Sequence, residues 1–80
     1  GRGIVNMKPM YISDTIMGEI KLEKRKDNET DFEFYDVYQV SKHPYKENDK
    51  YLGELHTSNE GKALEQDVYI FLTEHKALNN

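Results

Sequence analysis

Three stretches of the chain alternate apolar and polar residues, a pattern typical of β-strands with one buried face. The first covers residues 16–22 and the second covers residues 32–40. The third covers residues 50–56, where Gly53 indicates a bulge or a close approach of the backbone. Residues 4–12 contain shorter apolar runs interrupted by Pro9, which favours an edge strand.

The second stretch has apolar side chains on both sides, which favours a central strand. One side carries Phe32, Phe34, Asp36, Tyr38 and Val40, and the other carries Glu33, Tyr35, Val37 and Gln39. We expect the first side to face the core. Tyr35 and Val37 are then expected on the opposite, open side of the sheet.

A helix is predicted for residues 58–77, because apolar residues recur there at intervals of three and four. Just before it, Thr57 and Glu60 have the spacing of a capping box, in which each side chain bonds the backbone amide of the other residue.

These elements predict an α+β fold, a small antiparallel meander of three to four strands with one C-terminal α-helix packed on one face. The 80 residues are expected to form one domain. Met7 offers a plausible start, so residues 1–6 are interpreted as a remnant or a disordered end. The expected core is Ile16, Ile20, Leu22, Phe32, Phe34, Tyr38, Val40, Tyr51, Leu55, Leu64, Val68, Phe71 and Leu72.

Charge and the lack of cysteine narrow the function classes. Fifteen Asp and Glu against eleven Lys and Arg give a net charge of −4, whereas a protein that binds a phosphate backbone is normally basic. Without cysteine there are no disulfides and no thiolate sites. No apolar run reaches the roughly 18 residues of a membrane span, so we expect a cytoplasmic protein without a membrane partner.

No constellation of residues indicates catalysis. His43, His56 and His75 lack the spacings of metal ligands, and the scattered glycines form no phosphate-binding loop. We therefore expect no catalytic residues, no metal and no cofactor, and do not predict an enzyme. His75 is expected at the edge of the core.

An acidic run gives the first candidate surface. Asp27, Glu29, Asp31 and Glu33 occupy alternate positions, which in an extended chain would lie about 6.6 Å apart on one side. Such a row suits a basic groove of a partner that handles nucleic acid. Alternatively, the acids are a solvated hairpin tip, neutralised by the basic residues Lys21, Lys24, Arg25 and Lys26.

Tyrosine gives the second candidate surface, because the short chain contains six. Tyr35, Val37 and Tyr45 are the residues that we expect to contact a partner. A homodimer through the same face, or simple cross-strand packing, would also cover them.

The leading hypothesis is a non-catalytic protein-binding or regulatory module, such as a small accessory or inhibitory protein of a mobile element, acting on a basic partner. The alternative is a nucleic-acid-binding module that uses the sheet face and the cluster Lys21–Lys26. Residues 51–55 followed by a Thr-capped helix resemble the end of the integrase arm-binding type of DNA-binding domain, and we take this resemblance as an indication of the fold alone. That resemblance implies basic residues on the open sheet face, where this chain has Glu19, Glu23, Glu33 and Glu54.

Overall fold

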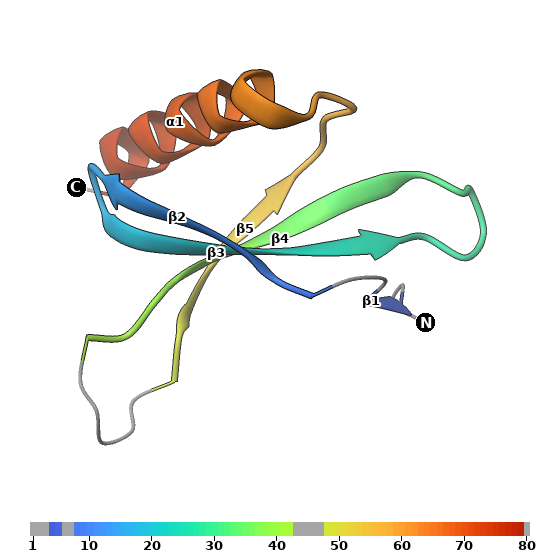
Figure 1. Cartoon of the computed structure of the whole chain (residues 1–80), viewed down its shortest axis with the longest axis horizontal. Coiled ribbons are helices and arrows are strands. Elements are labelled where there is room, and N and C mark those ends of the chain that lie inside the picture. The colour runs from blue at the N-terminus through green and yellow to red at the C-terminus, as the bar shows by residue number, and fades with distance from the viewer. Residues whose placement is uncertain (1–3, 6–7, 43–47, 80) are drawn as a thin grey trace.

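A computed structural model describes residues 4–5, 8–42 and 48–79, which form a sheet followed by one helix (Figure 1). The elements are β1 (Ile4–Val5), β2 (Met10–Thr15), β3 (Gly18–Lys26), β4 (Glu33–Gln39), β5 (Lys50–Leu55) and α1 (Gly61–Leu78). All pairings are antiparallel. Because β1 and β2 pair with successive parts of β3, the sheet is four strands wide. The predicted α+β meander with a C-terminal helix is confirmed.

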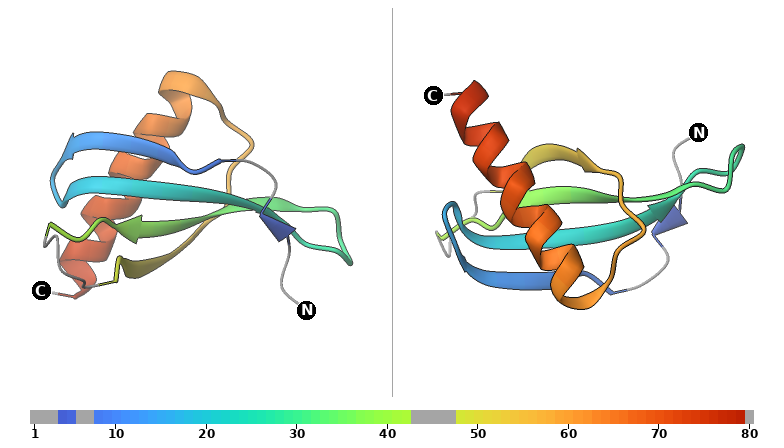
Figure 2. Two further views of the ribbon diagram at one scale, coloured as in Figure 1. Left: turned by 60° about the horizontal axis from the view of Figure 1, so that its bottom comes forward. Right: turned by 90° about the horizontal axis from the view of Figure 1, so that it is seen from above.

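Helix α1 crosses one face of the sheet, and no helix of the described residues lies on the opposite face (Figure 2). The apolar stripe of α1 is buried against the sheet, as its spacing predicts. The core contains Ile20, Leu22, Tyr35, Val37, Leu52, Leu64, Val68 and Leu72. We call the side of the sheet that α1 covers the helix face, and the other side the open face.

The orientation of β4 is the reverse of the prediction. Tyr35 and Val37 lie on the helix face and are 6% and 0% exposed. The register explains this orientation, because Val37 pairs with the core residue Leu22. Phe34 and Tyr38 therefore project from the open face, where Phe34 is nevertheless buried as predicted, at 6% exposed. Both sides of β4 are apolar enough to be buried, so the alternation of β4 alone could not decide between them.

A bulge in β5 changes which of its side chains reach the core. Gly53 pairs with Val37 but Tyr51 pairs with Tyr38, so Leu52 is an extra residue in the ladder. Leu52 consequently joins the core and Tyr51 lies on the open face, contrary to the prediction. Gly53 has φ +140°, and a Cβ there would lie 3.3 Å from Cζ of Phe71. The predicted bulge is confirmed, and the close neighbour of this glycine is the Phe71 ring.

Two further core predictions are wrong because the residues lie in turns. Ile16 occupies the turn between β2 and β3, where the Thr15 hydroxyl donates to the Gly18 carbonyl at 2.6 Å, and Ile16 is exposed. Phe32 lies in the turn between β3 and β4 and is 68% exposed. Val40 follows β4 and is half-buried.

The helix begins at Gly61 and the predicted capping box does not form. Glu60 is the N-cap residue and makes no side-chain cap. The Thr57 hydroxyl instead donates to Asp67 on α1 at 2.6 Å, and the Asn59 amide donates to the same carboxylate at 2.8 Å. These bonds fix the loop between β5 and α1 against the helix.

Candidate protein-binding surface

Three tyrosines lie in one line across the open face. Tyr11 of β2 pairs with Lys21 of β3, Lys21 pairs with Tyr38 of β4, and Tyr38 pairs with Tyr51 of β5. We call Tyr11, Tyr38 and Tyr51 the tyrosine row. The rings of Tyr38 and Tyr51 are 5.4 Å apart. Tyr11 and Tyr51 are 55% and 50% exposed, so the row presents aromatic surface to solvent from both outer strands.

Acidic residues form a second line beside the tyrosine row. Glu23, Asp36 and Glu54 are paired across β3, β4 and β5. Asp36 is only 2% exposed. Its carboxylate accepts hydrogen bonds from Arg25 Nε and from the Tyr51 hydroxyl, the latter at 3.3 Å. The bond to Asp36 raises the pKa of the Arg25 guanidinium.

Lys21 connects the tyrosine row to nearby carboxylates. Its Nζ lies 2.9 Å from Asp49, 3.4 Å from Glu23 and 4.8 Å from the centre of the Tyr38 ring. The hydrogen bond between Lys21 and Asp49 raises the pKa of Lys21 and lowers that of Asp49. The backbone amide of Ser41 also donates to Asp49, at 3.1 Å, and lowers the same pKa.

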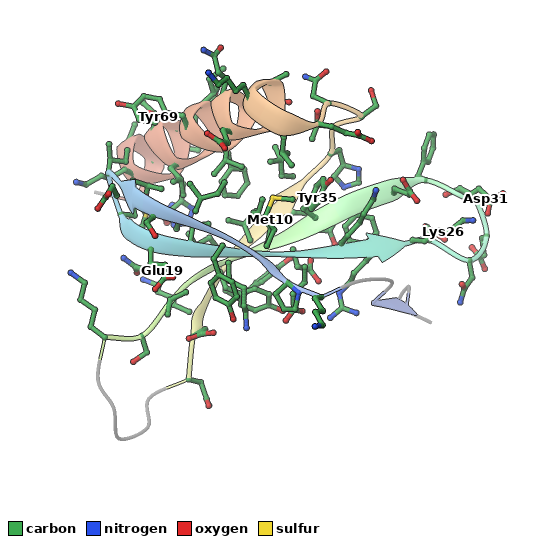
Figure 3. The ribbon with its side chains drawn as sticks, viewed as in Figure 1. Met10, Glu19, Lys26, Asp31, Tyr35 and Tyr69 are labelled. Atoms are coloured by element: carbon green, nitrogen blue, oxygen red, sulfur yellow. The ribbon has the colours of Figure 1, made fainter. Side chains whose placement is uncertain are left out.

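The open face is acidic overall. Among the described residues, this face carries five carboxylates and two cations, which give it a formal net charge of −3. The carboxylates are Glu19, Glu23, Asp36, Asp49 and Glu54, and the cations are Lys21 and Arg25. Figure 3 shows Glu19 on the side of the sheet away from α1, whereas Tyr35 points toward the helix. An acidic surface with exposed aromatic rings favours cations, since a ring face attracts an ammonium or a guanidinium group.

The acidic hairpin between β3 and β4 does not form the predicted row of carboxylates. Only Glu33 lies in a strand, and residues 27–32 form the turn. Asp27 stabilises this turn, because its carboxylate accepts from the Glu29 amide at 2.8 Å and its carbonyl accepts from the Asp31 amide at 2.9 Å. Asp31 has φ +63°, which breaks the extended geometry that the row requires.

Basic residues of β3 neutralise some of the acidic residues of this hairpin. The sequence analysis proposed such neutralisation as the alternative to a partner-binding row. Lys26 lies 3.5 Å from Asp31, and Lys24 lies 3.3 Å from Glu33. The hydrogen bond with Glu33 raises the pKa of Lys24. The hairpin extends away from α1 with Lys26 and Asp31 near its end (Figures 1 and 3). Its tip exposes Phe32 and Glu29.

The basic cluster Lys21–Lys26 is divided by the strand geometry. Alternation in β3 places Lys21 and Arg25 on the open face, and Lys24 and Lys26 on the helix face. All four cations pair with carboxylates. The four basic side chains therefore do not gather into one positively charged patch.

The other predicted contact residues and the three histidines lie in different parts of the structure or outside the described residues. Tyr35 and Val37 cannot contact a partner at the open face, because both are buried under α1, and a dimer that covers them would first have to displace the helix. Tyr45 and His43 lie outside the described residues. His56 stacks on Phe34 with the ring centres 5.2 Å apart, and its Nε2 lies 3.0 Å from Glu54. His75 is half-buried beside Phe71, at the edge of the core as expected.

The sequence prediction assigned Tyr38 and Tyr51 to the core and did not include Tyr11 among the expected contact residues. One residue carried the signal for the correct side of β4. A carboxylate on the helix face would lie among apolar residues, whereas Asp36 on the open face meets Arg25. Asp36 therefore identifies the side of β4 that faces away from α1.

Neither membrane insertion nor a known relative gives a further indication of function. In the part of the chain that the structure describes, no helix has the length and apolar character needed to cross a membrane. Comparison with protein-family models, with curated proteins and with solved structures finds no match for this chain.

Proposed function

We propose that this protein is a non-catalytic binding module that uses its open sheet face to recognise a basic surface of another protein. The observation that carries the proposal is the tyrosine row, which lies within an acidic face. Tyrosine is frequent at the centres of protein interfaces, because its ring buries a large area at a small cost in side-chain entropy.

The charges of the face support a basic partner. Of the residues that the structure describes, five carboxylates and two cations lie on the open face and give it a negative charge. Opposite charge on a partner speeds association and excludes acidic competitors. Lys21, whose Nζ lies 4.8 Å from the centre of the Tyr38 ring, is an intramolecular example of a cation on this aromatic row.

The experiment compares three immobilised forms of the protein in a lysate of its source organism. They are the wild type, a Tyr11→Ser/Tyr51→Ser variant, and a Tyr69→Ser control. Tyr69 is a matched control, because it is 56% exposed but lies on α1 (Figure 3). Proteins that bind the open face should be retained by the wild type and the control and lost from the double variant.

Each retained protein is then purified, and its dissociation constant is measured at low and high salt. We expect the double variant to bind at least about tenfold more weakly, and the wild-type affinity to fall as salt screens the charges. Equal retention by all three forms, or an affinity that salt does not change, would refute the proposal.

Nucleic acid remains the second candidate partner, through Lys21, Arg25 and stacking on the tyrosine row. The ion pairs of both cations and the negative charge of the face weigh against it. A gel-shift titration with DNA and RNA tests this alternative. Salt-sensitive binding would reverse the ranking, and no binding at low salt would exclude nucleic acid.

A further inference from the structure

The ammonium group of Lys21 lies in a small site that the sheet builds around it. One wall is the Tyr38 ring, whose centre is 4.8 Å from Nζ. The carboxylates of Asp49 and Glu23 lie 2.9 Å and 3.4 Å from the same atom. An aromatic face with two carboxylates is the combination that binds an organic cation.

The backbone helps to hold this site independently of Lys21. The Ser41 amide donates to Asp49 at 3.1 Å. Tyr38 packs against Tyr51 on the adjacent strand, which limits the movement of its ring. Removal of the lysine side chain should therefore leave the ring and the Asp49 carboxylate near their present positions.

We propose that the open face contains a binding site for the cationic head of a partner's lysine or arginine, and that Lys21 occupies this site in the free protein. The inference rests on the proposed function, in which the partner is basic. Binding then exchanges one cation for another, because the flexible Lys21 side chain moves into solvent as the partner's side chain enters.

The exchange is energetically reasonable for a lysine at this position. The two ion pairs of Lys21 are partly exposed to solvent, and ion pairs near the protein surface stabilise a protein only weakly, so a partner's cation can displace the Lys21 ammonium group. A guanidinium group should bind this site more strongly than an ammonium group does, because it is planar and less strongly hydrated. It can also stack on the Tyr38 ring while it donates hydrogen bonds to a carboxylate.

The test removes Lys21 and supplies a small cation in its place. The wild type, Lys21→Met and Lys24→Met are titrated with n-propylguanidinium chloride and followed by NMR at the Tyr38 ring and the Ser41 amide. Lys24 is a matched control, because it also lies on β3, pairs with a carboxylate and approaches a tyrosine ring, but on the helix face. A titration with sodium chloride corrects for ionic strength.

We expect saturable shifts at both signals in Lys21→Met, with a dissociation constant about tenfold lower than in the wild type or in Lys24→Met. Equal shifts in all three proteins, or shifts no larger than those with sodium chloride, would overturn the inference. If Lys21→Met loses the dispersed amide spectrum of the folded protein, Lys21→Gln replaces it with the same expected result.

The outcome separates this inference from the proposed function. Loss of partner binding in the Tyr11→Ser/Tyr51→Ser variant, without a cation site in Lys21→Met, would support the binding face and refute the exchange at Lys21. A cation site in Lys21→Met would support the exchange site even if no basic protein is retained by the tyrosine row.

Discussion

Replacement of Val37 and of its neighbour Tyr38 tests which side of β4 faces the helix. Val37→Ala removes two carbons from a side chain with no exposed surface, which costs about 1.6 kcal/mol at about 0.8 kcal/mol per buried carbon. The cavity that remains raises the expected loss to about 2–3 kcal/mol. Tyr38→Thr keeps a strand-forming residue and removes the ring contacts with Tyr51 and with the Lys21 ammonium group, so we expect a loss of about 1 kcal/mol.

Urea unfolding followed by circular dichroism gives both free energies, with an unchanged m-value as the sign that the compared states are the same. For a domain of this size, the larger loss should lower the melting temperature by about 10–20 °C. A greater loss in Tyr38→Thr than in Val37→Ala would refute the reasoning. In that case β4 would turn its other side to α1, and the tyrosine row would not exist.

Three further predictions concern the polar network, the bulge and acid stability. Arg25→Ala should lower the free energy of urea unfolding by about 2 kcal/mol, because it removes a charged hydrogen bond from buried Asp36. Adding Asp36→Asn should recover part of this loss. A double variant less stable than Arg25→Ala would contradict this expectation. Gly53→Ala should cost about 1–3 kcal/mol in thermal unfolding through its positive φ and the contact with Phe71, so an unchanged melting temperature would contradict the bulge geometry. Hydrogen bonds from Thr57 and Asn59 lower the pKa of Asp67 below its ordinary 3.8, so the ionised carboxylate stabilises the folded protein fully above pH 3.8, and this stabilisation is lost as the pH falls through the lowered pKa. The free energy of unfolding of Asp67→Asn should therefore fall less than that of the wild type between pH 7 and pH 3. An equal fall in the two proteins would show that Asp67 does not contribute to acid sensitivity.

The sequence was sufficient to predict which segments are strands and which is the helix. A period of two is typical of a strand with one buried face, and a spacing of three and four is typical of an amphipathic helix. The sequence was insufficient for the side that β4 presents, since Phe34 and Tyr38 compete with Tyr35 and Val37 for burial. Register decides that competition, and register depends on pairing with β3 rather than on β4 itself.

The candidate surface was harder to predict for the same reason. Tyr51 reaches the open face only because Leu52 is an extra residue in β5, and a bulge changes the alternation that a periodic pattern assumes. The capping box failed for a different reason. Thr57 has a second acceptor, Asp67, which is distant in the sequence and becomes available only once α1 packs.

The position of β3 has a consequence for the order of folding. This strand pairs with β1, β2 and β4, and its hairpins with β2 and β4 each close over a short loop. Short closures lower the contact order and speed the search for the native topology. We therefore expect β3 with its two adjacent hairpins to form the folding nucleus, so that substitutions there slow refolding, whereas substitutions in β1 mainly accelerate unfolding.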